Sequence, residues 1–277
     1  MRRGKYRIGI IGRGYVGSAV ESFLTLESDH EVMSYDVLDG KGIGEGYREI
    51  AQFSDIIYLC LPTPMNRDGS CCTDIVESAV KSLNFYTKLA NKTPVLLIKS
   101  TMVPGTSDKL QELASNLLVV TNPEFLTARR AKLDFHTAGR HLLGVPRGKH
   151  SIIANVLEKY HQDLWPHAEV VFTEPREAEL IKYLTNSYFT VKVSVANQIY
   201  DLCDKLDINY EDFIESAVEA DPRLGELHWQ VPGPDGKRGF GGECFNKDLS
   251  GMIYLLNEKQ CDASMFKASE DYNSRIR

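Results

Sequence analysis

One stretch near the end of the sequence, residues 236–251 (GKRGFGGECFNKDLSG), combines a cysteine, two adjacent glycines and a pair of charged residues. Cys244 follows the glycines at 241 and 242 after a single Glu243, and Lys247 and Asp248 come three and four residues later. A cysteine reacts as its thiolate, which a nearby lysine and a glycine-rich backbone favour. The carboxylate of Glu243 acts in the opposite direction, because a neighbouring negative charge raises the pKa of a thiol.

The remaining cysteines show no spacing typical of a metal site or of a disulfide framework. None belongs to a CxxC pair and two are sequence neighbours, so neither a structural zinc ion nor a set of disulfides is expected. A lone cysteine is most often a small buried hydrophobe. We interpret Cys60, inside the apolar run IIYLCL, and Cys203, on an apolar helical face, in this way. The remaining cysteines are Cys60, Cys71, Cys72, Cys203 and Cys261.

A glycine-rich motif near the start of the chain, Gly12-x-Gly14-x-x-Gly17, follows a strand-like apolar run and opens a helix-like segment. Glycines in this setting allow a tight turn and let a pyrophosphate approach the amino-terminus of the helix. Asp36 lies 24 positions after Gly12, near the spacing at which a carboxylate meets the adenosine ribose hydroxyls. A carboxylate there repels a 2'-phosphate, so the pattern predicts NAD rather than NADP. The glycines could instead simply form a tight turn. We favour cofactor binding, because the motif, the preceding strand, the following helix and the acidic residue all fit it.

A second pair of polar residues lies on a long helical segment. Lys182 and Asn186 are four residues apart in AELIKYLTNS, residues 178–187, so both side chains project from the same helix face. Fixed donors of this kind can stabilise a developing negative charge. The spacing alone, however, would also fit an ordinary solvated helix face.

The elements that must position these residues follow a pattern typical of an α/β protein. Short apolar runs alternate with amphipathic segments, as expected for a parallel sheet with crossover helices. We therefore predict a Rossmann-like, doubly wound parallel sheet in residues 1–174. A helical domain in residues 175–277 would follow, built on a long central helix after Pro175. The predicted strands are YRIGII, HEVMSYD, DIIYLCLP, PVLLIKS, LLVVTNP, RHLLGVP and AEVVFTE. The other predicted helices are 16–26, 74–89, 151–160, 210–220 and a segment from 247 to the end.

Length and composition limit the functional classes. The 277 residues suffice for a large domain or two ordinary ones. The net charge of -6 argues against a general nucleic-acid-binding protein. No amino-terminal leader stands out, and no apolar run approaches the roughly 20 residues that span a bilayer. We expect a cytoplasmic protein with no membrane or nucleic-acid partner.

Six short segments occur in the order found in the nucleotide-sugar dehydrogenases, the family of the UDP-glucose and GDP-mannose 6-dehydrogenases. The resemblance extends from Tyr6 to about Arg277, and six ordered motifs are far more specific than any one of them. It implies oxidation of the C6 alcohol of a nucleotide sugar to a carboxylate with two NAD, and UDP-glucose is the favoured substrate. The segments are LPTP (61–64), KSTMVPGT (99–106), NPEFL (122–126), AELIKYLTNS (178–187), DPRLG (221–225) and GFGGECFNKD (239–248).

The resemblance also implies a role for individual residues. Cys244 matches the nucleophile that captures the aldehyde, and Lys182 and Asn186 match the groups that stabilise the oxyanion. Thr101 and Asp248 match the pair that positions a water molecule, and Glu124 matches the general base of thioester hydrolysis. The implied cofactor contacts are Gly12, Gly14, Tyr15, Val16, Gly17, Asp36, Lys41, Thr63, Thr101 and Lys247. The implied substrate contacts are Glu124, Phe125, Leu126, Lys182, Asn186, Gly241 and Arg223, the last reaching the neighbouring subunit of a homodimer formed through the long helix.

Departures from the family pattern leave alternatives open. Ala128 replaces a second glutamate, and Glu243 and Asn246 stand where a small residue and a proline are usual. The family's third domain, a further Rossmann-like unit that holds much of the nucleotide, is expected to be absent. One alternative is a one-step 3-hydroxyacid dehydrogenase, which would not need Cys244. The other is a shortened, non-catalytic relative that still binds NAD.

Overall fold

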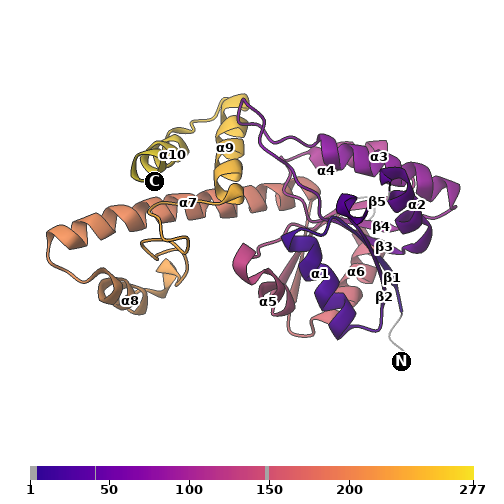
Figure 1. The fold of residues 1–277 in the computed structure, drawn as a ribbon, viewed down its shortest axis with the longest axis horizontal. Helices are drawn as coiled ribbons and strands as arrows, with labels where there is room; N and C mark the ends of the chain where they lie inside the picture. The colour runs from indigo at the N-terminus through magenta and orange to yellow at the C-terminus, as the bar shows by residue number, and fades with distance from the viewer. Residues whose placement is uncertain (1–4, 41, 147–149) are drawn as a thin grey trace. The chain divides into compact units, whose positions relative to one another are not determined.

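Seven strands form one sheet in the computed structural model, which describes residues 5–40, 42–146 and 150–277 (Figure 1). The strand order is β2-β1-β3-β4-β5-β6-β7. Neighbours run parallel except β5 and β6, which pair antiparallel through Thr121 and Gly144. All seven predicted strands are confirmed, and the antiparallel pair is the one departure from the predicted parallel sheet. The bounds are β1 Arg7–Ile11, β2 Glu31–Tyr35, β3 Ile56–Leu59, β4 Val95–Ile98, β5 Leu118–Thr121, β6 Arg140–Gly144 and β7 Glu169–Thr173.

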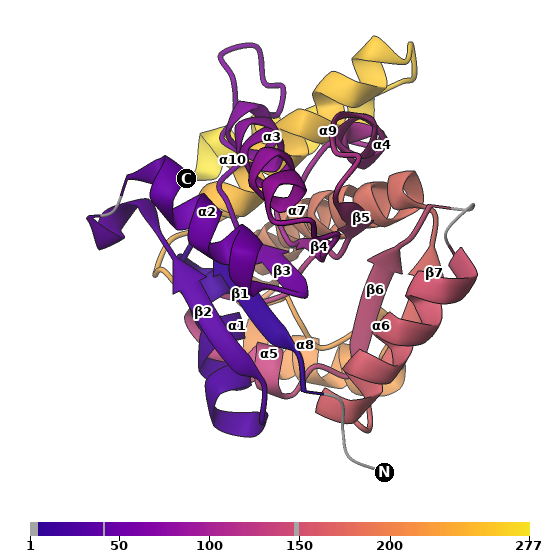
Figure 2. The same ribbon diagram turned by 90° about the vertical axis from the view of Figure 1, so that its right-hand side faces the viewer.

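Helices cover both faces of this sheet, as a doubly wound fold requires (Figures 1 and 2). Successive strand residues point to opposite faces. In β3, Ile56 and Tyr58 therefore pack in the layer of α1, α5 and α6, whereas Ile57 and Leu59 pack in the layer of α2, α3 and α4. The bounds are α1 Tyr15–Glu27, η1 Val37–Asp39, α2 Ile43–Phe53, α3 Asp74–Leu89, α4 Thr106–Leu113, η2 Ala128–Arg130, α5 Ala131–His136 and α6 His150–Leu164.

The remaining helices include the predicted long helix, which runs without interruption over 31 residues. The predicted helices 74–89 and 210–220 coincide with α3 and α8. The helix predicted from Lys247 to the end is corrected in two ways. It begins at Glu243, which places Cys244 in its first turn, and the segment divides into two helices, α9 and α10. The three helices α2, α4 and α5 were not predicted. The bounds are α7 Pro175–Lys205, α8 Tyr210–Ala220, η4 Pro222–Leu224, α9 Glu243–Glu258 and α10 Ser264–Ile276.

The chain divides into two compact units. Unit 1 comprises Met1–Pro64 and Cys72–Lys182, and unit 2 comprises Met65–Cys71 and Tyr183–Arg277. The first turns of α7 belong to unit 1 because they pack closely on β6. A Cβ added to Gly144 would lie 2.7 Å from the Cα of Pro175 and 2.9 Å from the Cβ of Ala178.

Unit 2 has two small apolar cores. In one, Ala196 and Cys203 of α7 pack with Tyr210 of α8 and with Val231. The other joins α9 and α10 and contains Phe240, Leu249, Ile253 and Ala263. Within the described residues, no helix combines the length and the apolar character needed to cross a bilayer.

Candidate functional site

The glycine motif makes the turn from β1 into α1, and each of its glycines has a separate task. Gly12 has a φ of +87°, and an added Cβ would lie 2.3 Å from the carbonyl oxygen of Cys60. An added Cβ on Gly17 would lie 1.7 Å from the carbonyl oxygen of Gly12. Gly14 is the N-cap of α1 and borders open space. The turn and the close packing therefore require glycine, and the amino-terminus of α1 stays accessible to a ligand.

Asp36 lies directly after β2 and supports this turn. Its carboxylate accepts the backbone N–H of Arg13 at 2.6 Å and that of Leu38 at 3.0 Å. These two hydrogen bonds, the one from Arg13 first, hold the pKa of Asp36 below its ordinary value. The Arg13 guanidinium pairs with Glu21 at 3.1 Å and with Asp39 at 3.0 Å. Three carboxylates thus lie at this turn with one guanidinium, which two of them already pair, and this net negative charge is unfavourable to an additional phosphate.

The other predicted cofactor residues of unit 1 differ in their surroundings. Thr63 is buried, and its hydroxyl donates to the carbonyl oxygen of Thr101 at 2.7 Å. Tyr15 is 75% exposed, whereas Val16 packs against the core. Lys41 lies outside the described residues. The structure therefore brings Thr63 and Thr101 together and leaves the Tyr15 ring free to contact a ligand.

The predicted substrate residues of unit 1 converge on Lys182. Its Nζ lies 3.2 Å from Oε1 of Glu124 and 5.3 Å from the centroid of the Phe125 ring. Both partners of the ion pair are largely buried, since 5% of the Lys182 side chain and 13% of the Glu124 side chain are exposed. Oε2 of Glu124 also accepts the backbone N–H of Leu126 at 2.6 Å. The turn after β5 thus holds Glu124 against an ammonium group.

A second lysine, Lys99 at the end of β4, was not identified from the sequence. It is 5% exposed, and its Nζ lies 5.9 Å and 5.4 Å from the ring centroids of Tyr58 and Phe135. Burial lowers the pKa of Lys99 to about 8, although the charge of Glu124 opposes the effect. The only sequence signal was a lysine that directly follows a buried apolar strand.

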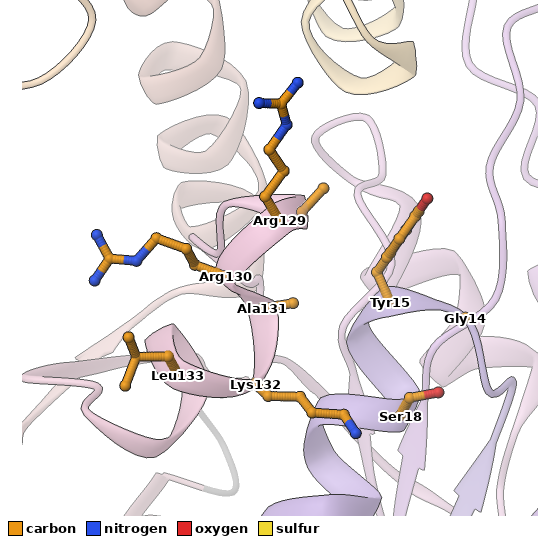
Figure 3. A pocket seen from close by; sticks show the side chains of 9 residues that line it. Gly14, Tyr15, Ser18, Arg129, Arg130, Ala131, Lys132 and Leu133 are labelled. Carbon is orange, nitrogen blue, oxygen red and sulfur yellow. The ribbon is translucent and has the colours of Figure 1, made fainter. Parts of the chain in front are cut away.

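A pocket of about 670 Å³ opens between the start of α1 and the η2–α5 segment (Figure 3). Three cations line it, and none was predicted. Arg130 pairs with Asp134 at 3.5 Å, whereas Arg129 and Lys132 have no ion-pair partner in the part of the chain that the structure describes. Lys132 extends toward Ser18 in Figure 3. The lining residues are Gly14, Tyr15, Ser18, Ala128, Arg129, Arg130, Ala131, Lys132 and Leu133.

In unit 2, a buried polar group forms between α7 and α9. Nδ2 of Asn186 donates to Oδ2 of Asp248 at 2.6 Å, and Oδ1 of Asp248 accepts from Nζ of Lys247. Asp248 is fully buried and Asn186 is 7% exposed. A buried carboxylate is stable when cationic and amide donors satisfy both of its oxygens. Unit 2 therefore brings three of the predicted residues together.

Cys244 is exposed in the first turn of α9. The N-cap of this 16-residue helix is Gly242, with a φ of +77°. The positive end of the helix dipole lies at this terminus and favours a negative charge there. The first turn of α9 thus suits a nucleophilic thiolate, by a route that the sequence analysis did not include.

The remaining predicted substrate residues of unit 2 have local partners. Arg223 is exposed and pairs with Asp221 two residues earlier. An added Cβ on Gly241 would lie 1.9 Å from a guanidinium nitrogen of Arg277, so this glycine makes room for Arg277. Across the described residues, no group of three His, Cys, Asp or Glu side chains is placed to hold a metal ion.

Comparison with known proteins gives matches over both parts of the chain. Residues 42–164 match the NAD binding domain of the UDP-glucose/GDP-mannose dehydrogenase family, and residues 176–275 match the central domain of the same family. A UDP-glucose 6-dehydrogenase of Rhizobium meliloti is 28% identical, over 89% of this chain and 62% of its own length. The chain spans about two thirds or less of the length of such relatives.

Two solved structures are informative about the fold. A UDP-glucose dehydrogenase from Pyrobaculum islandicum superposes with a TM-score of 0.85 at 24% identity, over 98% of this chain and 68% of its own. A 3-hydroxyisobutyrate dehydrogenase from Mycobacterium tuberculosis superposes with a TM-score of 0.74 at 17% identity, over 98% of this chain and 94% of its own. At these identities the likeness establishes the fold alone.

Proposed function

Because this chain belongs to the UDP-glucose/GDP-mannose dehydrogenase family, we propose that it is an NAD-dependent nucleotide-sugar 6-dehydrogenase with UDP-glucose as its favoured substrate. The NAD-binding domain would be residues 1–174 and the central domain residues 175–277. The observation that carries the proposal is Cys244, exposed in the first turn of α9, four residues before the buried Asp248. A dehydrogenase that only interconverts an alcohol and a carbonyl group needs no nucleophile.

The proposed reaction begins with two successive oxidations of C6. Bound NAD would supply the hydride acceptor for both, and in the first oxidation the proton of the C6 hydroxyl passes to water. After the first, the Cys244 thiolate adds to the aldehyde carbon and the carbonyl electrons pass to oxygen, which gives a thiohemiacetal. The ammonium of Lys182 and the amide of Asn186 stabilise that oxyanion. Loss of the second hydride leaves a thioester on Cys244.

Hydrolysis then releases the product. Thr101 and Asp248 position a water molecule, and Glu124 accepts its proton as the oxygen attacks the thioester carbon. The carbon–sulfur bond breaks, the thiolate leaves, and the product is the uronate. The contact of 3.2 Å between Lys182 and Glu124 supports this role, because it holds the largely buried carboxylate in a fixed position.

The cofactor assignment to NAD rather than NADP rests on charge. Asp36, Asp39 and Glu21 outnumber the single guanidinium of Arg13 at the turn after β1, so a 2'-phosphate would meet net negative charge. The cations of the η2–α5 pocket lie beside Gly14, at the amino-terminus of α1, where the diphosphate is expected. We include Arg129 and Lys132 in the diphosphate site.

A homodimer is proposed on the apolar side of α7. Tyr188, Val195 and Leu202 recur every seven residues and are 55%, 41% and 51% exposed. A seven-residue apolar repeat on an exposed helix face is typical of helix pairing. We expect a dimer in sedimentation at micromolar concentration and a monomer for the Val195→Glu variant. A wild-type monomer would contradict the assignment.

Two alternatives are separated from this proposal, one by a variant and the other by a measurement on the wild type. One alternative is a one-step 3-hydroxyacid dehydrogenase, since a 3-hydroxyisobutyrate dehydrogenase shares the fold. The other is a non-catalytic relative that still binds NAD. In Cys244→Ser, the first oxidation should persist while uronate formation collapses, since oxygen is a far poorer nucleophile and leaving group than a thiolate. Full turnover by this variant would support the one-step alternative. NAD binding without turnover of any nucleotide sugar by the wild type would support the second alternative.

A further inference from the structure

Glu179 is a buried carboxylate with no role in the reaction described above. It lies on α7, one helical turn before Lys182, and is 2% exposed. A carboxylate in such a place is costly unless donors satisfy both of its oxygens. Its partners therefore reveal why the chain tolerates it.

Both oxygens of Glu179 accept backbone N–H groups at the start of α4. Oε2 accepts from Gly105 at 2.6 Å, and Oε1 accepts from Ser107 at 2.8 Å. Gly105 is the N-cap of α4 and has no side chain with which to cap it. Helix α4 thus receives its capping acceptor from another helix, where a carboxylate also meets the positive end of the helix dipole.

The capped segment is continuous with Thr101, and its other end is also fixed. The hydroxyl of Ser100 accepts the N–H of Leu61 at 3.1 Å and donates to the carbonyl oxygen of Leu61 at 2.7 Å. Thr63 donates to Thr101 as described above. Residues 100–107 are therefore attached at one end to the turn after β3 and at the other end to α7.

We propose that Glu179 is a positioning residue, which holds the Thr101-bearing segment on α7 at a fixed distance from Lys182. The inference rests on the proposed function for its catalytic consequence, but not for the contact itself. An ionised carboxylate can accept both N–H groups fully. A protonated one has a single strong acceptor, so the attachment weakens when Glu179 takes up a proton.

The charge state of Glu179 changes near neutral pH. Burial raises its pKa to about 7 despite the Ser107 hydroxyl and the two N–H donors, and Asp108 on α4 adds a smaller effect in the same direction. Arg176 on α7 is ion-paired with Asp108 and offsets part of that charge. The attachment should thus weaken progressively as the pH falls through about 7.

The direct test follows the backbone amide protons of Gly105 and Ser107 by NMR in the wild-type protein, from about pH 5 to about pH 9. Both resonances should shift together with a midpoint near 7, and this shift should be absent in Glu179→Gln. Amide resonances that do not titrate, or that titrate equally in Glu179→Gln, would overturn the proposal. This measurement requires no enzymatic activity, so its failure is distinct from failure of the proposed function.

The kinetic test uses the same variant. An amide in place of the carboxylate presents an NH2 group to one of the two N–H donors, so kcat should fall by about tenfold while the KM for NAD stays within about twofold. The acid limb of the pH–rate profile near 7 should disappear, and Glu179→Asp, which keeps two acceptors, should restore part of kcat. Glu112→Gln, an exposed change on α4, should match the wild type. An unchanged pH profile in Glu179→Gln would contradict the positioning role.

Discussion

At the level of single residues, the candidate site contains charged side chains that would face the opposite charge of a ligand or of a reaction intermediate. The pocket cations Arg129 and Lys132 are exposed and without an acidic partner among the described residues, beside the amino-terminus of α1. A cation without an acidic partner is repelled by the positive amino-terminal end of a helix. An anion that binds between them removes this repulsion. In the function proposed above, the diphosphate of NAD would supply that anion.

Replacing these cations should weaken NAD binding. In Arg129→Ala and in Lys132→Ala, the Kd for NAD should rise by about five- to tenfold, and its dependence on salt concentration should become shallower. Calorimetric titration measures both quantities. Lys109→Ala removes an exposed lysine from α4 and serves as the control. Equal affinity in all three variants would remove Arg129 and Lys132 from the diphosphate site.

The sequence predicts the arrangement of residues whose partners lie close to them along the chain. Gly12, Gly17 and Asp36 belong to a single strand–turn–helix–strand segment, so their spacing alone predicts the glycine turn and an acidic residue at the end of the next strand. Glu179 and Lys99 could not be recognised in this way. The partners of Glu179 lie 72 and 74 positions away, and Lys99 is buried only because β4 lies in the centre of the sheet.

At the scale of elements, α7 is the part on which both groups of candidate residues depend. It carries Lys182 in unit 1 and Asn186 in unit 2. Apolar residues recur at helical spacing along the 31 residues of α7. The sequence therefore predicts this helix well. The short helices α4 and α5 span 8 and 6 residues, too few for a clear period.

Enlarging the glycine against which α7 packs should destabilise the fold. In Gly144→Ala, the added methyl group meets Pro175, Ala178 and Thr121 at 3.0 Å or less. Overpacking of this kind costs about 1–3 kcal/mol of unfolding free energy, measurable by urea denaturation. Gly139→Ala, where nothing lies within 4 Å of the added atom, is the matched control. Similar unfolding free energies for the two variants would show that β6 and α7 are not closely packed.

At the scale of the whole molecule, the sheet encloses titratable groups whose charge states set its stability. His161 is 1% exposed, and burial lowers its pKa to about 4, while burial also lowers that of His141 to about 2. Both are neutral in the folded protein at neutral pH. The unfolded chain, with an ordinary value of 6.5, binds protons more readily as the pH falls.

Acid should therefore destabilise the protein below pH 6.5. As the pH falls from 6.5 to the folded pKa of a buried histidine, that histidine lowers the unfolding free energy by about 1.4 kcal/mol per pH unit. Glu179 acts oppositely between 4.5 and 7, because its raised pKa favours the protonated folded state. The unfolding free energy of the His141→Phe variant, measured by urea denaturation between pH 5 and 6, should depend less steeply on pH. The decrease should equal about the contribution of one buried histidine. An unchanged slope would mean that His141 is protonated in the folded state.

The proposed four-electron oxidation through Cys244 can be checked by counting the NADH formed for each sugar consumed. With UDP-glucose and excess NAD, absorbance gives the NADH formed and chromatography gives the sugar consumed. The account predicts two NADH for each UDP-glucose consumed, with the uronate as product, because the captured aldehyde is oxidised again before release. One NADH per sugar, with an aldehyde or ketone released into solution, would contradict it.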